Sequence, residues 1–215
     1  MKPTHEHLIA ASAGTPSDRR PILVDTPPLR LGVVVGSTRP GRRGAAVAAW
    51  ATRVAGAHLQ GVAVELRTLD LAEFGLPLLD EPVPAAFGEY ARPHTRRWAG
   101  AVAACDGFLF VTPEYNHSLP AALKNALDFL HAEWHDKAAG VIGYGVAGGV
   151  RAIEHLRQVL GELRVADVRT AVTLSLSADF SGDAFAPRAH QAEQVRRLAD
   201  EVSAWSRALQ SLRGR

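Results

Sequence analysis

The stretch GSTRPGRRG, residues 36–44, follows an almost continuously apolar run, Leu29–Gly36, and precedes an Ala-rich segment, Ala45–Ala57. The apolar run is typical of a buried strand, and the Ala-rich segment carries apolar residues every three or four positions, as an amphipathic helix does. The sequence between them is rich in glycine, hydroxyl and arginine side chains. It therefore predicts a strand-to-helix turn of an α/β protein, at the end of the strand where such folds bind ligands.

The rest of the chain continues this alternation. Further strands are expected at residues 62–69, 106–112, 138–144 and 168–176, and further helices at residues 95–105, 120–130, 149–160 and about 187–212. Five strands that alternate with helices predict a parallel sheet with helices on both faces, and 2-1-3-4-5 is the natural strand order. Residues 1–28 are polar and Pro-rich, so we expect a flexible N-terminal extension ahead of one domain, residues 29–215.

Composition narrows the class of protein. Of the 215 residues, 47% are apolar, which is enough for a sizeable core, and the net charge is only +2. So small a basic excess argues against a nucleic-acid partner, which requires clustered Lys and Arg. Cys105 is the single cysteine, which excludes an internal disulfide and favours a reducing compartment. Without an apolar run of ~18 residues or a signal-peptide pattern, a cytoplasmic protein with no membrane partner is expected.

The first turn has the chemistry of a phosphate site. Ser37 and Thr38 offer hydroxyls, and Arg39, Arg42 and Arg43 offer fixed positive charge beside the N-terminus of the following helix. The nucleotide motif GxxxxGK[ST] is not matched, because the two adjacent arginines stand where it requires Lys and a hydroxyl. The turn therefore predicts a site for a phosphate monoester.

Two further loops, residues 113–118 and 143–149, are expected at the same edge, because the carboxyl ends of parallel strands lie together. Tyr115 is suited to flank a flat ring, and Asn116 and the neighbouring amides can hydrogen-bond ring heteroatoms. The glycines of 143–149 allow backbone to approach a ligand closely. They also spell GxGxxG, but after the fourth strand and without the acidic residue of a dinucleotide site.

Other chemistry has little support in the sequence. Glu114 lacks a neighbouring nucleophile or partner acid, and His131 and His135 lack the Glu that follows the first His of a zinc protease motif. We therefore expect no catalytic side chain and no metal site. Ser118 and Pro120 are interpreted as helix punctuation, with Ser118 as the N-cap.

Three motifs together point to one family. They are PEYNHSLPAALKNALD at Pro113–Asp128, GSTR at Gly36–Arg39 and GVAGGVR at Gly145–Arg151. From about residue 30 to residue 176 the chain resembles the NADPH-dependent FMN reductase family of flavodoxin-like proteins. That family includes quinone, chromate and azo-dye reductases.

The resemblance implies a flavodoxin-like sandwich that binds FMN. Ser37 and Arg39 would hold the phosphate, and Gly145 would lie near one side of the ring. The residues that would line the isoalloxazine are Pro113, Glu114, Tyr115 and Asn116. Many members have Ser and Asn in place of Arg42 and Gly44, so phosphate contacts are expected to extend to Arg42.

The expected function is that of an FMN-dependent oxidoreductase. Hydride would pass from NAD(P)H, with NADPH favoured by the resemblance, through FMN to a small-molecule acceptor such as a quinone, flavin, metal oxyanion or azo compound. The family also implies a homodimer or homotetramer, with residues 120–137 near the contact. Two alternatives remain open: a flavodoxin-type carrier that binds FMN without oxidising NAD(P)H, and a phosphate-ligand binder without redox function.

Overall fold

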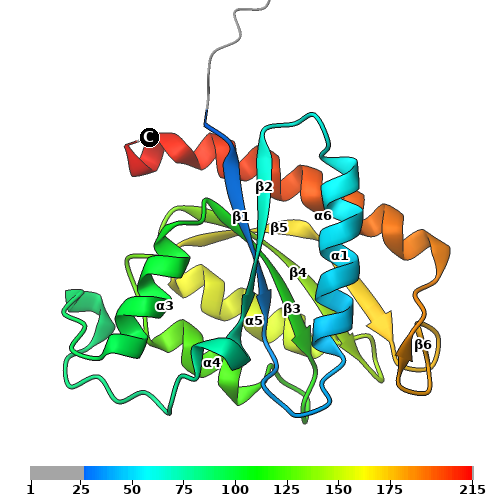
Figure 1. The fold of residues 1–215 in the computed structure, drawn as a ribbon, viewed down its shortest axis with the longest axis horizontal. Helices are drawn as coiled ribbons and strands as arrows, with labels where there is room; N and C mark the ends of the chain where they lie inside the picture. Colours follow the sequence, from blue (N-terminus) through cyan, green and yellow to red (C-terminus); the bar gives the residue numbers. More distant parts are fainter. Residues whose placement is uncertain (1–26, 215) are drawn as a thin grey trace, which may run out of the picture.

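Five parallel strands form the centre of the computed structural model, which describes residues 27–214 (Figure 1). The strands are β1 (Leu29–Val35), β2 (Val64–Asp70), β3 (Gly107–Pro113), β4 (Lys137–Gly145) and β5 (Val165–Ser175). Their order is β2-β1-β3-β4-β5, so the predicted flavodoxin-like topology is confirmed. The strands begin and end within three residues of the expected positions. The predicted flexible extension, apart from Pro27 and Pro28, lies outside the described residues.

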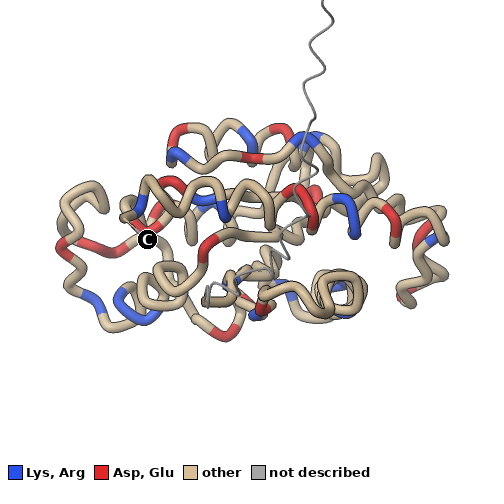
Figure 2. Tube along the Cα trace, turned by 90° about the horizontal axis from the view of Figure 1, so that it is seen from above, with Lys and Arg blue, Asp and Glu red and all other residues tan. Residues whose placement is uncertain are grey.

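Helices cover both faces of the sheet (Figure 1). Helices α1 (Gly44–His58) and α6 (Ala189–Ala208) share one apolar cluster with the sheet. On the opposite face, a second cluster joins α3 (Pro93–Ala103), α4 (Ala121–Asp128) and α5 (Val150–Glu162). Figure 2 shows basic and acidic residues interspersed along both outer layers. The molecule is therefore a three-layer sandwich whose strand ends are left open for a site.

Several short elements were not expected from the sequence. They are α2 (Leu71–Phe74), the 3-10 turn η1 (Ala85–Phe87), and the two-stranded hairpin β6 (Phe180–Ser181) and β7 (Ala184–Phe185). The helix expected at about 187–212 is α6 followed by the 3-10 turn η2 (Leu209–Arg213). One local interpretation was also wrong. Pro120, not Ser118, occupies the N-cap of α4, and the Ser118 hydroxyl instead hydrogen-bonds Nδ1 of His155 at 2.9 Å.

Helix α6 lies unusually close to the sheet at two glycines. A Cβ on Gly140 in β4 would stand 2.5 Å from Cδ1 of Leu198, and one on Gly107 in β3 would stand 2.2 Å from Oγ of Ser206. Both distances are far inside van der Waals contact. The absence of side chains at these two positions therefore decides how closely α6 packs, which a helix pattern alone does not specify.

We expect Gly140→Ala to lower the free energy of unfolding by roughly 1–3 kcal/mol, because overpacking a dense interior forces neighbours from their rotamers. Urea denaturation measures this change. The matched control is Gly100→Ala in α3, where an added Cβ meets no atom within 4 Å. There the change should raise stability by about 0.5–1 kcal/mol through helix propensity. Similar effects of the two substitutions would contradict the close approach of α6.

Candidate cofactor site

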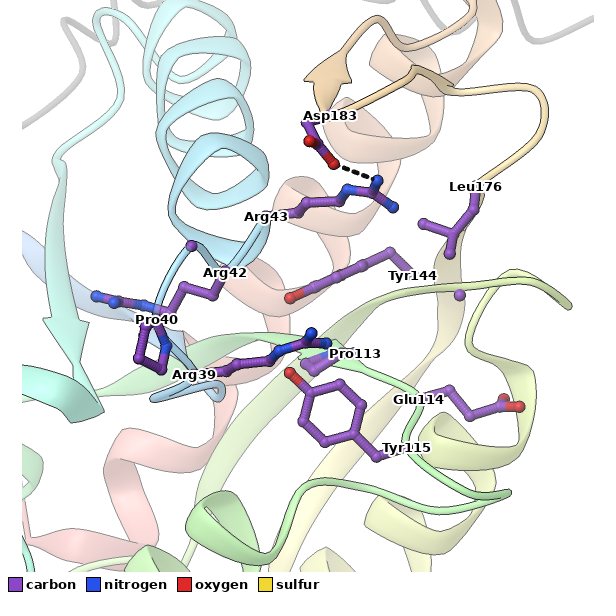
Figure 3. Close-up of a pocket in the computed structure, with 12 residues that line it drawn as sticks. Arg39, Pro40, Arg42, Arg43, Pro113, Glu114, Tyr115, Tyr144, Leu176 and Asp183 are labelled. Atoms are coloured by element: carbon purple, nitrogen blue, oxygen red, sulfur yellow. Dashed lines mark hydrogen bonds and ion pairs between the residues drawn. The ribbon is translucent and has the colours of Figure 1, made fainter.

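The loops after β1, β3 and β4 meet at one edge of the sheet and surround a cavity of about 260 Å³ (Figure 3). The residues that line it are Arg39, Pro40, Gly41, Arg42, Arg43, Pro113, Glu114, Tyr115, Tyr144, Gly145, Leu176 and Asp183. Six of the nine predicted site residues are among them. The other three are Ser37, Thr38 and Asn116, which lie close by but do not line the cavity.

The three arginines of the 36–44 loop differ in their partners. Nη2 of Arg42 donates to Oδ2 of Asp70 at 2.5 Å, and Figure 3 shows its guanidinium turned away from the cavity. Arg43 is bound to the hairpin by its contact with Asp183. Arg39 extends across the cavity towards Pro113 and Tyr115 (Figure 3). Within residues 27–214 its guanidinium has no hydrogen-bond or ion-pair partner, so Arg39 is the cation that an anion in this cavity would meet.

Asp70 ties the first loop to the neighbouring strand. Its Oδ1 accepts the amide N–H of Ala72 at 3.0 Å and caps helix α2, while its other oxygen receives Arg42. Nε of Arg42 is buried without a partner among the described residues. A phosphate contact from Arg42 therefore remains a prediction, which would involve a side chain already shared with Asp70.

Ser37 and Thr38 lie on different sides of the first loop. The hydroxyl of Ser37 is buried and lies 2.8 Å from the Tyr115 hydroxyl, which links the loops after β1 and β3. Thr38 is exposed and lines a separate cavity with Gly75 and Asn125. The two hydroxyls that look equivalent in sequence are thus placed in different environments, and their role in binding phosphate remains a prediction.

The loop after β3 is a tight turn with two strained residues. Tyr115 and Ser118 exchange backbone hydrogen bonds of 2.9 and 3.1 Å across it. Between them Asn116 and His117 have φ values of 46° and 72°, the left-handed region that non-glycine residues rarely occupy. Strain of this kind is concentrated at functional sites. Within the described chain the N–H groups of Asn116 and His117 make no hydrogen bond, so they remain free to donate.

The Glu114 carboxylate binds Arg151 at the start of α5 and is not placed as a general base. Its carboxylate forms an ion pair with the Arg151 guanidinium and accepts the Arg151 backbone N–H at 3.0 Å, at the start of α5. Burial alone would raise the pKa of Glu114, but these hydrogen bonds outweigh it and hold the pKa below its ordinary value. The side chain is therefore an anion bound to α5, and Figure 3 shows it directed away from Tyr115.

The loop after β4 brings backbone close to the cavity. Gly149 has a φ of 77°, and a Cβ there would lie 2.5 Å from the Tyr144 amide nitrogen, so only glycine fits. Gly145 lines the cavity beside Glu114. Tyr144 packs its ring beneath the first loop, where its hydroxyl approaches Gly44. Burial raises the pKa of Tyr144 above its ordinary value, so this hydroxyl remains a neutral phenol.

Six lining residues were not among the predicted site residues. Pro40, Gly41, Arg43 and Tyr144 belong to the predicted loops, whereas two lie outside all three loops: Leu176 and Asp183. The last two lie on or before the β6–β7 hairpin. A signal for that hairpin was present, because Gly182 and Asp183 form a short polar turn between two phenylalanines. The sequence analysis missed the hairpin because its strands, of two residues each, are too short to show an alternating pattern.

Asp179 anchors the segment that leads into the hairpin. Its side chain is fully buried and accepts hydrogen bonds from the Ser175 amide, the Arg188 amide and guanidinium, and the Gln191 side chain. Burial alone would raise the pKa of Asp179, but the bonds from Arg188 and Ser175 hold it below the ordinary value. Asp179 therefore joins the end of β5 to the start of α6.

The strand order and the helices on both faces define a flavodoxin-like α/β protein, with a cavity at the carboxyl ends of its strands. The model of the NADPH-dependent FMN reductase family matches residues 29–179, and the chain belongs to this family. Family membership confirms the predicted FMN-dependent oxidoreductase, in which hydride from NAD(P)H passes through FMN to a second acceptor. It favours this enzyme over the electron-carrier alternative.

Individual relatives agree with that assignment. The chain is 39% identical over 145 residues to the NAD(P)H-dependent FMN reductase LOT6 of Saccharomyces cerevisiae, covering 64% of this chain and 76% of that protein. It is 33% identical over 138 residues to a quinone reductase of Escherichia coli, covering 61% and 69%.

Solved structures support the fold. The flavoenzyme FerB, an NAD(P)H:acceptor oxidoreductase of Paracoccus denitrificans, superposes with a TM-score of 0.66 at 22% identity, covering 84% of this chain and 98% of FerB. Flavodoxin 1 of Bacillus cereus gives a TM-score of 0.51 at 14% identity, covering 81% and 97%.

Within residues 27–214, no group of three or more potential metal ligands occurs. In the same range, no helix is both long and apolar enough to span a membrane.

We expect Asp179→Asn to lower the free energy of unfolding at neutral pH by roughly 1.5–3 kcal/mol, the contribution of a hydrogen bond to a charged group. Because the pKa of Asp179 is lowered in the folded protein, its stabilisation is complete above the ordinary carboxyl pKa of about 4 and lost as the pH falls through the lowered value. The gap between wild type and variant should therefore narrow in acid. Denaturant titrations at several pH values measure it, and a pH-independent gap would contradict the role of the charge.

Proposed function

We propose that FMN occupies the cavity between the loops after β1, β3 and β4. Its phosphate would lie at residues 37–43, and its ring between the 113–116 loop and Gly145. The observation that carries this proposal is the unpaired guanidinium of Arg39, which extends into the cavity while the other two arginines of its loop are paired within the described chain. The N-terminus of α1 adds to the positive potential, because it has no side-chain cap among the described residues.

The residues present fit a flavin phosphate and a flat ring. A phosphate monoester requires cationic and N–H donors, which Arg39 and the first turn of α1 supply. A ring requires an aromatic or backbone surface at a strand end, which Tyr115 and Gly145 supply. When bound, FMN accepts hydride from NAD(P)H and passes electrons to a second substrate, so the protein's own contribution is placement and electrostatics.

Each protein group then has a defined task. Arg39 pairs with the phosphate, and the Ser37–Tyr115 hydrogen bond holds the first two loops together. The free amide groups of Asn116 and His117 donate to the electronegative edge of the ring. Glu114 fixes α5 against the β3 loop through Arg151 and takes no part in proton transfer.

We further propose that residues 29–215 form the FMN-binding domain and that the protein acts in the cytoplasm as a homodimer or homotetramer. Small quinones are the acceptors to test first, because several similar proteins are named quinone reductases or quinone oxidoreductases. NADPH is the donor to test first, since the family bears its name.

The central experiment reconstitutes the purified protein with FMN and records its visible spectrum before and after anaerobic addition of NADPH. Bleaching within seconds, followed by recovery on addition of a quinone, is the expected result. The proposal would be refuted by a protein that shows no flavin absorption once free FMN has been removed, or by a bound flavin that NADPH does not bleach. Chromate, an azo dye and free flavin, offered in parallel, rank the acceptors.

A sharper prediction concerns Arg39. Arg39→Ala should weaken FMN binding roughly 10- to 150-fold, as expected when a charged hydrogen bond of about 1.5–3 kcal/mol is lost. Quenching of flavin fluorescence measures the affinity. Riboflavin, which lacks the phosphate, should bind both proteins equally. The matched control is Arg196→Ala on α6, whose side chain pairs with Glu193 on the surface. Unchanged FMN affinity in Arg39→Ala would exclude its phosphate role.

A further inference from the structure

The β6–β7 hairpin begins where the match to the family ends. The family model covers residues 29–179, and the hairpin occupies residues 180–185. Phe180 pairs with Phe185, and Ser181 with Ala184, around a turn in which Gly182 has a φ of 59°. The turn residue Asp183 and the preceding Leu176 both line the cofactor cavity. The hairpin therefore lies beside the site and outside the residues that the family model matches.

Aromatic packing fixes the body of the hairpin over the site. The rings of Phe180 and Phe185 lie 5.0 Å apart, and Phe185 meets Trp50 of α1 edge-to-face at 5.3 Å. Phe180 also lies 6.2 Å from the ring of Tyr144, the residue beneath the first loop. Contacts of this type stabilise beyond simple area burial. The hairpin is consequently held against Trp50 of α1 and Tyr144 of β4, and Tyr144 lies next to the loop that would hold the phosphate.

The turn of the hairpin is held by one arginine of the phosphate loop. Nη2 of Arg43 donates to the Gly182 carbonyl at 3.0 Å and to Oδ1 of Asp183 at 2.8 Å, and its guanidinium lies 5.3 Å from the centre of the Phe180 ring. Figure 3 shows this bridge above Tyr144, at the rim of the cavity. We call the Arg43–Asp183 contact the clasp. It joins the loop that would hold the phosphate to the segment that covers it.

The base of the hairpin is rigid, whereas the clasp is exposed. Asp179, immediately before β6, is fully buried and hydrogen-bonded on both carboxylate oxygens. Asp183 is fully exposed and Arg43 is partly exposed, so their ion pair is open to solvent and salt. An arrangement with a fixed base and a weakly fastened turn can open at the turn without unfolding the domain.

We propose that the β6–β7 hairpin is a cover that retains FMN, and that the clasp of Arg43 and Asp183 is a positioning pair that slows FMN release. The inference rests on the proposed FMN site. Its functional consequence is that the flavin stays resident through many turnovers. Electrons then leave on a second small molecule, and FMN does not exchange as a diffusing substrate.

The direction in which Asp183→Asn changes the rate of FMN release separates this proposal from a simple effect of charge. Asp183 is an anion beside the predicted position of a phosphate, so, if it acted only by charge repulsion, Asp183→Asn would slow FMN release. If the clasp retains the cofactor, Asp183→Asn instead speeds release, by about two- to fivefold, the range expected for an exposed ion pair. Release is measured with the FMN-loaded protein by trapping free flavin with an excess of a second FMN-binding apoprotein.

The matched control is Asp200→Asn on α6, where an exposed carboxylate lies 2.9 Å from Nε2 of His58 and neither residue lines the cavity. It should leave FMN release unchanged. The ratio of the FMN release rates of Asp183→Asn and wild type should also approach one at 1 M salt, where charges are screened within about 3 Å. Because Asp183 is fully exposed, its substitution leaves the core intact.

Release that is unchanged or slower in Asp183→Asn would overturn the proposal, and so would an equal acceleration in Asp200→Asn. These outcomes leave the proposed function standing, because wild type would still bind FMN and be bleached by NADPH. Failure of the wild-type protein to bind FMN would instead refute the proposed function itself. The two failures are therefore distinguished by the wild-type binding measurement, which comes first.

Discussion

The division of charge among three arginines of one loop shapes this site. Arg42 is held by Asp70 at the end of β2, and Arg43 is held by Asp183 on the hairpin, so the loop is tied to the chain on two sides. Arg39 is left without a partner within the described residues and extends into the cavity (Figure 3). A fixed charge that lacks a protein counter-ion, at the positive end of a helix, favours an anionic ligand. The two paired arginines thus fix the position of the loop, and Arg39 is the one proposed to bind the phosphate.

The other two loops meet this cavity through backbone more than through side chains. The turn after β3 holds Asn116 and His117 in a conformation that costs conformational energy, and within the described chain its amide groups stay free. The loop after β4 depends on Gly149, where any side chain would collide with Tyr144. A site built mainly from backbone suits a flavoprotein, because the cofactor carries the redox chemistry and the protein contributes shape and dipoles. Glu114, for which the sequence predicts no catalytic role, forms an ion pair with Arg151 at the start of α5.

The β6–β7 hairpin lies directly after the part of the chain that the family model matches. The family match covers residues 29–179, which contain all three of the motifs proposed to bind FMN. The adjoining hairpin is held by Asp179 at its base, by the aromatic pair Phe180 and Phe185, and by the clasp to Arg43. A family that shares one cofactor site can differ in how long the cofactor stays, because release depends on what covers the site as well as on the contacts within it.

The sequence by itself determined the fold and the family. Continuous apolar strands, helical periodicity and the motifs at residues 36–39, 113–128 and 145–151 were enough for the strand order and for FMN chemistry, because these signals are local and repeat along the chain. Tertiary structure alone decided which arginine is free, that Glu114 is bound by Arg151, and that Asp183 reaches Arg43 from 140 positions away. Local sequence cannot specify such pairings, because an ion pair forms only where the packed sheet and helices bring two distant charges together.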